Sequence, residues 1–413
     1  MSKVVVIGGG PAGVLCACTA ALNGNSVTLI ERNLKIGRKL MITGKGRCNV
    51  TNFCTDPKEV IDQVPVNGSF LYSALSSFMT YDTMELFESL GVPLKVERGN
   101  RVFPESDKSS SIVDALAKYL KQCGVNQIHG RVSGLIFDSD GEEKTVKGVQ
   151  LENGESIFCD KVVIATGGLS YKATGSDGDG YRLAESAGHE IIDPVPSLVP
   201  IESDDDFCKR LQGLSLKNIS IRIVDNKSGK TVYKDFGEML FTHFGVSGPV
   251  ILSASSHIRN IRENQYTLFI DLKPALSEEQ LDFRIRRDFD EQLNKDFGNS
   301  LGGLLPSKII PVVVEKTQIP SDKKINQLTK QERHALVYTL KNFSVSLSAF
   351  RPINEAIITS GGVCVKEINP KTMESKLTKN LFFAGEVIDV DAYTGGFNIQ
   401  IAFSTGHLAG ESV

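Results

Sequence analysis

A cluster of glycines near the N-terminus constrains this 413-residue chain more than any other feature of its sequence. Gly8, Gly10 and Gly13 follow a β-branched run at residues 4–7 and open an alanine-rich helical stretch at residues 12–22. A second apolar run stands at residues 27–30. Continuous apolar strands separated by a helix are typical of a parallel sheet buried on both faces. The pattern predicts a βαβ unit.

The glycine spacing and a carboxylate beyond it predict what this unit binds. The first glycine of such a loop permits a tight turn, the second lets backbone approach a pyrophosphate, and the third lets helix and strand pack closely. The phosphates then lie at the helix N-terminus. Glu31 ends the second strand, where a carboxylate can accept both ribose hydroxyls of an adenosine. A glycine-rich turn beside a surface glutamate is the simpler interpretation, but the full combination favours a dinucleotide.

Two features near the C-terminus favour FAD over NAD. A buried strand at residues 381–384 ends at Gly385 and is followed by Glu386 and Asp389, which can supply a second contribution to a long cofactor. Gly396 precedes a predicted helix that begins with Asn398, Ile399 and Gln400. Backbone N–H groups at that helix N-terminus would stabilise negative charge on a reduced flavin.

The middle of the chain has a different residue pattern from the two ends. Prolines cluster at residues 194–200, and alternating apolar residues at 219–223 indicate a half-buried antiparallel sheet. Two capping-box spacings, Ser277 with Gln280 and Thr329 with Glu332, predict helices. We therefore expect an α/β fold with a cofactor domain at residues 1–193 and 350–413, a β-rich insertion at 194–275 and 342–349, and a helical insertion at 276–341.

Composition excludes several classes of protein. The 46 Lys and Arg against 49 Asp and Glu leave a net charge of −3, so no nucleic-acid partner is expected. Eight cysteines without a CxxC pair indicate a reducing, cytoplasmic setting. Glycines and a proline interrupt the apolar N-terminal run, which argues against a membrane span or signal peptide. We expect a small-molecule substrate, no membrane partner and no metal, and the sequence leaves the oligomeric state open.

Three further strings carry a resemblance to a known family. They are TGKGRCNVTN at residues 43–52, THFGVSGP at 242–249, and Ala165-Thr166-Gly167-Gly168, which closes a buried strand. Together they resemble the BaiN-like, or HI0933-like, NAD(P)/FAD-dependent oxidoreductases, over the whole chain from Val4. The resemblance implies a Rossmann-like FAD domain built from both chain ends, interrupted by a β-barrel-like part and a helical part.

The resemblance also implies a set of FAD contacts. Beyond the fingerprint glycines, residues from several parts of the chain would touch the cofactor: Pro11, Ala12, Glu31, Arg32, Arg38, Lys39, Gly44, Val132, Gly385, Asp389, Asn398, Ile399 and Gln400. Ala165, Thr166, Gly167, Glu386 and Gly396 are further candidates, and Arg47 can offset charge near the flavin or hold a phosphate. NAD(P)H can act as a transient reductant.

The expected reaction is hydride transfer through flavin N5 on a small or medium organic substrate, because family members act on steroid-like enones and on a small amino ketone. His243 is the candidate proton donor, since its ordinary pKa lies near neutrality. Cys48 and Asn49 are candidates for the substrate-facing wall, and each residue also fits a purely structural role.

Three alternatives stay open beside an FAD-dependent oxidoreductase. The first is a flavin-binding redox sensor without turnover. A flavin disulfide reductase would use Cys48 and Cys54, although their spacing is wider than such enzymes use. Flavin-dependent RNA modification gains no support from the net charge of −3.

Overall fold

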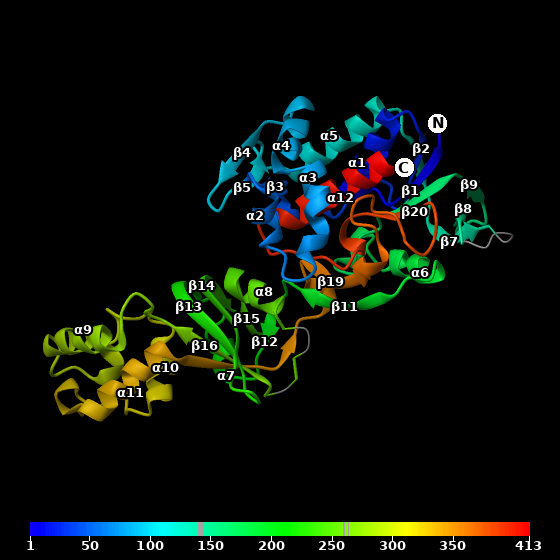
Figure 1. Ribbon diagram of the computed structural model, residues 1–413. Coiled ribbons are helices and arrows are strands. Elements are labelled where there is room, and N and C mark those ends of the chain that lie inside the picture. The colour runs from blue at the N-terminus through cyan, green and yellow to red at the C-terminus, as the bar shows by residue number, and fades with distance from the viewer. Residues whose placement is uncertain (139–143, 259–260, 263) are drawn as a thin grey trace. The chain divides into compact units, whose positions relative to one another are not determined.

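The computed structural model describes residues 1–138, 144–258, 261–262 and 264–413. The chain forms two compact units (Figure 1). The first unit contains Met1–Ser197 and Pro352–Val413, and the second contains Leu198–Arg351. Among the residues described, no helix is both long and apolar enough to cross a membrane.

A five-stranded parallel sheet forms the centre of the first unit. Its order is β20 (Leu381–Phe383), β10 (Lys161–Ile164), β1 (Lys3–Ile7), β2 (Ser26–Glu31) and β6 (Asn126–His129). The predicted βαβ unit is confirmed, because β1 and β2 pair in parallel and are joined by α1 (Pro11–Leu22). The C-terminal strand β20 pairs with β10 through Val162 and Leu381. The Rossmann-like sheet is therefore built from both chain ends, as predicted.

The last helix, α12 (Phe397–Ser412), packs on α1 (Figure 1), and two of its glycines let the two backbones approach closely. A Cβ at Gly406 would lie 2.3 Å from the Ala12 carbonyl oxygen, and one at Gly410 would lie 2.7 Å from that of Cys16. Because α1 follows the glycine loop directly, this contact brings the C-terminal segment to that loop. On another side of α1 lies α5 (Ser109–Gln122).

Small antiparallel sheets and short helices complete the first unit. The sheets are β3 (Thr51–Asn52), β5 (Arg101–Pro104) and β4 (Leu94–Glu97); β7 (Val132–Phe137), β8 (Val146–Leu151) and β9 (Ser156–Phe158); and β11 (Ile191–Ser197) with β19 (Ile358–Val363). The helices are α2 (Pro57–Ile61), α3 (Tyr72–Ser77), α4 (Thr80–Ser89) and α6 (Asp179–Ser186).

The second unit is built on a seven-stranded antiparallel sheet. Its order is β17 (Phe343–Leu347), β16 (Tyr266–Asp271), β13 (Ser215–Asp225), β14 (Thr231–Phe241), β15 (Gly245–Ser247), β12 (Ile201–Glu202) and β18 (Ala349–Phe350). The two edge strands, β17 and β18, are consecutive in the chain and separated by Ser348 alone. The sheet must therefore curl until its edges approach one another, which is the barrel-like form expected from the sequence.

Helices flank this sheet and form a separate layer of the second unit. They are α7 (Asp206–Arg210), α8 (Pro249–Ser255), α9 (Glu278–Asp290), α10 (Ile310–Thr317) and α11 (Lys330–Lys341). Both predicted capping boxes are confirmed: Ser277 and Gln280 bond reciprocally at the start of α9, and Thr329 and Glu332 do so at the start of α11. These helices share one apolar core with the inner face of the sheet.

Candidate functional site

The glycine loop has the geometry that its spacing predicts. Gly8 has φ +107°, and a Cβ there would lie 2.4 Å from the Ala165 carbonyl oxygen. A Cβ on Gly13 would lie 1.9 Å from the Gly8 carbonyl oxygen, so only glycine lets α1 start this close to β1. Gly10 faces open space, and the N-terminus of α1 carries neither a side-chain cap nor an acidic residue. The helix dipole there is available to an anionic ligand.

Glu31 is held rigidly at the end of β2. One carboxylate oxygen accepts the Gly9 backbone N–H at 2.7 Å, and the other accepts both the backbone and the side-chain N–H of Asn33 at 2.7 Å each. Each carboxylate oxygen offers about two acceptor sites, so Oε2 keeps capacity for a further donor. The side chain is therefore an oriented acceptor beside the glycine loop.

A second helix N-terminus comes from the other end of the chain. Gly396 precedes α12 with φ +98°, and a Cβ on it would lie 2.3 Å from the Thr51 carbonyl oxygen. Asn52 donates to the Gly395 carbonyl at 3.0 Å, which ties this turn to the TGKGRCNVTN segment. The N-terminus of α12 also lacks a side-chain cap and an acidic residue. Gly385 packs against α1, where its Cβ would lie 2.8 Å from that of Ala12.

Several buried polar atoms of the first unit have no protein partner within the described residues. They include Thr166 Oγ1, Tyr181 Oη and Asn49 Oδ1. Burial raises the pKa of Tyr181, so its hydroxyl stays protonated and can donate. Buried polar groups are normally hydrogen-bonded, and such unpaired atoms call for a polar ligand or water. These atoms and the two uncapped helices fit a large dinucleotide.

Lys39 and Glu386, both predicted to contact the cofactor, form an ion pair with one another. Lys39 Nζ lies 2.6 Å from Glu386 Oε2 and donates to Ser170 Oγ at 2.6 Å. Glu386 also accepts the Thr359 backbone N–H at 3.1 Å. The cluster joins four segments of the chain. The roles of Ser170 and Thr359 could not be predicted from the sequence, because their partners lie far away in the chain.

The predicted arginines are engaged with acceptors of the protein itself. Arg32 pairs with Asp177, and Arg38 donates to Asn33 at 3.2 Å. Arg47 pairs with Glu97 and with Asp107, 2.7 Å away, and its guanidinium lies 4.0 Å above the Phe103 ring. These pairs fix the loop geometry around the site, with Gly44 in the left-handed region at φ +56°.

Two amide side chains of α12 brace the protein. Gln400 is fully buried; its oxygen accepts from Thr51 and Thr83, and its nitrogen donates to the Phe78 carbonyl and to Ser404. These bonds use its whole hydrogen-bonding capacity, so only its backbone remains for a ligand. Asn398 bonds both the N–H and the carbonyl of Ala392, which closes the preceding loop.

The remaining predicted contacts occupy these positions. Pro11 is the first residue of α1, and Ala12 is buried beside it. Val132 is buried at the start of β7, and Ile399 is half-buried in the first turn of α12. Ala165 is buried after β10, and Gly167 follows it with φ +76°. The Asp389 carbonyl and carboxylate both accept from Asn67, at 2.8 and 2.9 Å.

The candidate catalytic residues fall in different units. Cys48 is buried in the first unit with φ +59°, a strained backbone for a residue other than glycine. Burial raises the pKa of the Cys48 thiol to about 12 and that of Cys54 to about 11, so both stay protonated near neutral pH. This disfavours thiolate chemistry and the disulfide-reductase alternative. His243 is exposed in the second unit, beside Phe244.

Tyr181 carries a buried hydroxyl and was not among the site residues predicted from the sequence. It follows Gly180, whose Cβ would lie 2.0 Å from Thr166 Oγ1. The glycine-rich stretch before α6 was the available signal, since it marks a close approach of two backbone segments. No group of three or more His, Cys, Asp or Glu side chains suited to a metal occurs within the described parts of the chain.

The chain is similar to known proteins over nearly its whole length. The model of the HI0933-like protein Rossmann domain matches residues 2–412. A 3-dehydro-bile acid delta(4,6)-reductase of Clostridium scindens is 30% identical over 100% of this chain and 99% of its own length. A ribosomal RNA dihydrouridine synthase of Escherichia coli is 31% identical over 97% of this chain and 95% of its own length. The structure of a 3-ketosteroid-delta4-(5alpha)-dehydrogenase from Rhodococcus jostii has a similar fold, with a TM-score of 0.52 and 15% identity over 100% of this chain and 96% of that one.

Proposed function

Since the chain belongs to the HI0933-like family, with its Rossmann domain, we propose that it is an FAD-dependent oxidoreductase. One observation carries the proposal: two uncapped helix N-termini, from opposite ends of the chain, belong to one compact unit whose glycines allow close backbone contact. A single cofactor with a pyrophosphate at one end and an anionic ring at the other would use both. FAD meets that description better than NAD, which has no second ring system able to hold negative charge when reduced.

Different residues of this chain would bind different parts of FAD. The N-terminus of α1 would bind the pyrophosphate, and Glu31 would accept the ribose hydroxyls through its free acceptor sites. Backbone N–H groups at the start of α12 would face the flavin pyrimidine. Thr166 and Tyr181 offer unpaired polar atoms to the remainder of the cofactor. When bound, FAD supplies hydride transfer at N5, and the protein supplies position and electrostatics.

We further propose that the substrate bond is a carbon–carbon double bond conjugated to a carbonyl. Two full-length relatives are named for a delta(4,6)-reductase of a 3-dehydro-bile acid and for a synthase of dihydrouridine. Both names describe the saturation of such a bond, in a steroid enone and in a uracil ring. Saturation adds a hydride to one carbon and a proton to the other, and NAD(P)H can provide the two electrons through the flavin.

The substrate has two candidate classes, a small cyclic enone and a uridine within RNA. The expectation of a small molecule without nucleic acid rested on the net charge of the whole chain, which says nothing about local patches. The name of the E. coli relative favours RNA as the second candidate. His243, Cys48 and Asn49 remain candidate substrate contacts, with the Cys48 thiol acting as a neutral wall because it stays protonated.

Three measurements on the purified protein test this function. Denaturation should release FAD, identified by its mass; a colourless protein that FAD cannot reconstitute would refute the cofactor. Anaerobic reduction by NADH or NADPH should then be followed by reoxidation with a 3-oxo-Δ4 steroid or with unmodified ribosomal RNA, and the product should be two mass units heavier. A flavin that is reduced and reoxidised only by oxygen, with neither substrate altered, would indicate the redox sensor instead.

A further inference from the structure

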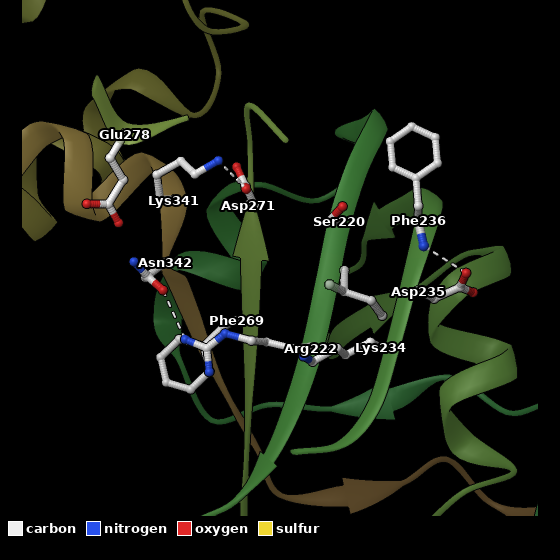
Figure 2. A pocket seen from close by; sticks show the side chains of 11 residues that line it. Ser220, Arg222, Lys234, Asp235, Phe236, Phe269, Asp271, Glu278, Lys341 and Asn342 are labelled. Carbon is white, nitrogen blue, oxygen red and sulfur yellow. Dashed lines mark hydrogen bonds and ion pairs between the residues drawn. The ribbon is translucent and has the colours of Figure 1, made fainter. Parts of the chain in front are cut away.

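The outer face of the seven-stranded sheet in the second unit carries an unusual set of side chains. Along β13 the odd-numbered residues Ile219, Ile221 and Ile223 are buried, so the even-numbered ones point to the opposite face. Cross-strand partners share a face, and Ser220 lies opposite both Phe236 and Asp271. Arg222 lies likewise opposite Lys234 and Phe269. These residues line an open hollow of about 490 Å³ (Figure 2).

Two aromatic groups flank the hollow. Phe236 is 60% exposed, although it lies in an interior strand of the sheet. The Arg222 guanidinium lies over the Phe269 ring, 4.0 Å from its centre, and donates to Asn342 at 2.9 Å, which holds the two groups stacked together. Ser220, whose side chain is small, lies opposite Phe236 and shares the outer face of β13 with Arg222 (Figure 2). A planar ring therefore has two stacking surfaces beside a shallow space.

The hairpin that bears this face is rich in cations without carboxylate partners. Within the part of the chain that the structure describes, none of its five cations forms an ion pair: Lys217, Arg222, Lys227, Lys230 and Lys234. Of its three acidic residues, Asp225 accepts the backbone N–H groups of its own turn and Asp235 accepts from the Tyr233 hydroxyl, while Glu238 is exposed at the far end of β14 from the turn, so five cations and three carboxylates leave the hairpin a charge of +2. The hairpin thus presents unneutralised positive charge.

The opposite side of the hollow has a different charge. Asp271 is neutralised by Lys341 at 2.5 Å, and Glu278 lies beside them at the start of α9 (Figure 2). A polyanion would avoid Glu278 and Glu238 and approach the turn end of the hairpin, where Arg222, Lys227, Lys230 and Lys234 lie. The charges therefore give the surface a direction, with a cationic track at the turn end and aromatic surfaces next to it.

We propose that this sheet face docks a single-stranded segment of RNA. Stacking on aromatic side chains next to a positively charged track is how proteins bind single strands, because unpaired bases expose their faces. Bases would stack on Phe236 and on the Phe269–Arg222 pair, while Lys227, Lys230 and Lys234 would contact phosphates. The inference rests on the proposed function, of which it selects RNA as the substrate class. A duplex hides its base faces and would use only the cations.

Binding of a fluorescent 12-nucleotide single-stranded oligouridine, followed by anisotropy at 50 mM salt, tests the surface directly. Phe236→Ala should weaken binding about 5- to 150-fold, the range for loss of one stacked base. The matched control is Phe158→Ala, which removes an equally exposed phenylalanine from strand β9 of the first unit and should leave binding unchanged. Because both side chains are exposed, neither change should alter the melting temperature.

Charge is tested by the double variant Lys230→Gln/Lys234→Gln. Each phosphate contact on a single strand contributes about 0.7 to the slope of log affinity against log salt, so this variant should flatten the slope by about 1.4. Lys118→Gln, an exposed lysine of α5, is the control. No binding by the wild type, or equal losses in the test and control variants, would overturn the inference.

Flavin content, read from absorbance in every sample, separates this inference from the proposed function. A yellow, NAD(P)H-reducible protein that does not bind the oligouridine would refute the RNA surface and leave the oxidoreductase standing. Conversely, a protein that binds it through Phe236 but cannot hold FAD would refute the proposed function and support the surface.

Discussion

Replacing Glu31 by glutamine tests the adenosine end of the site most directly. The carboxylate accepts three N–H groups, one from Gly9 and two from Asn33. Glutamine keeps one oxygen, and the smaller loss inside the protein places its NH2 group where Oε2 now faces the Gly9 N–H. The remaining acceptor site of Oε2 would take a ribose hydroxyl, so the bond lost on FAD binding is that ribose hydrogen bond. A hydrogen bond to a charged group contributes about 1.5–3 kcal/mol. The variant should therefore bind FAD roughly 10- to 150-fold more weakly.

The assay is a titration of apoprotein with FAD, followed by quenching of the flavin fluorescence. Glu155→Gln is the control, because Glu155 is an exposed carboxylate of the same unit. Thermal unfolding of the apoproteins measures the loss of the Gly9 bond separately, and FAD is titrated at a temperature at which both apoproteins are folded. Equal FAD affinity in wild type and Glu31→Gln would show that this carboxylate does not serve the cofactor. An equal drop in the Glu155→Gln control would show that the loss reflects net charge alone.

Three further predictions follow from the packing and the pKa shifts. Gly406→Ala places a Cβ 2.3 Å from the Ala12 carbonyl and should lower the urea-unfolding free energy by about 1–3 kcal/mol, whereas Gly302→Ala, with open space around it, should not. Native Cys48 should resist iodoacetamide at pH 8 because burial raises its pKa to about 12, and rapid alkylation there would contradict its burial. Burial lowers the pKa of His189 in the folded protein. Below about pH 6.5, the ordinary pKa of histidine, this side chain is therefore protonated in the unfolded chain but still neutral in the folded one. Stability should be full above that pH and fall as the pH drops towards the lowered folded value; His189→Asn should reduce this loss in urea midpoints measured at pH 7.5, 6.0 and 5.0, and an unchanged loss would assign it to other groups.

The sequence alone specified the features that depend on short stretches of chain. The strand, glycine loop and helix at residues 3–22 form as predicted, because Gly8 takes a positive φ and Gly13 leaves room for the Gly8 carbonyl oxygen, five residues before it. The capping boxes at Ser277 and Thr329 form for the same reason, since their partners lie three residues away. The three strings that carry the family resemblance also predicted that the two chain ends form one domain.

Only the tertiary structure decided what the long polar side chains do. Arg47 is paired with carboxylates about 50 and 60 residues away, and Gln400 makes three of its four side-chain hydrogen bonds to segments more than 300 residues distant. A side chain of this kind bonds whichever donor or acceptor the fold brings within about 3 Å, and sequence spacing does not encode that distance. The outer face of β13 and β14 follows the same rule. Alternation predicts that Arg222 and Phe236 face outward, but strand register alone brings aromatic and cationic groups together there.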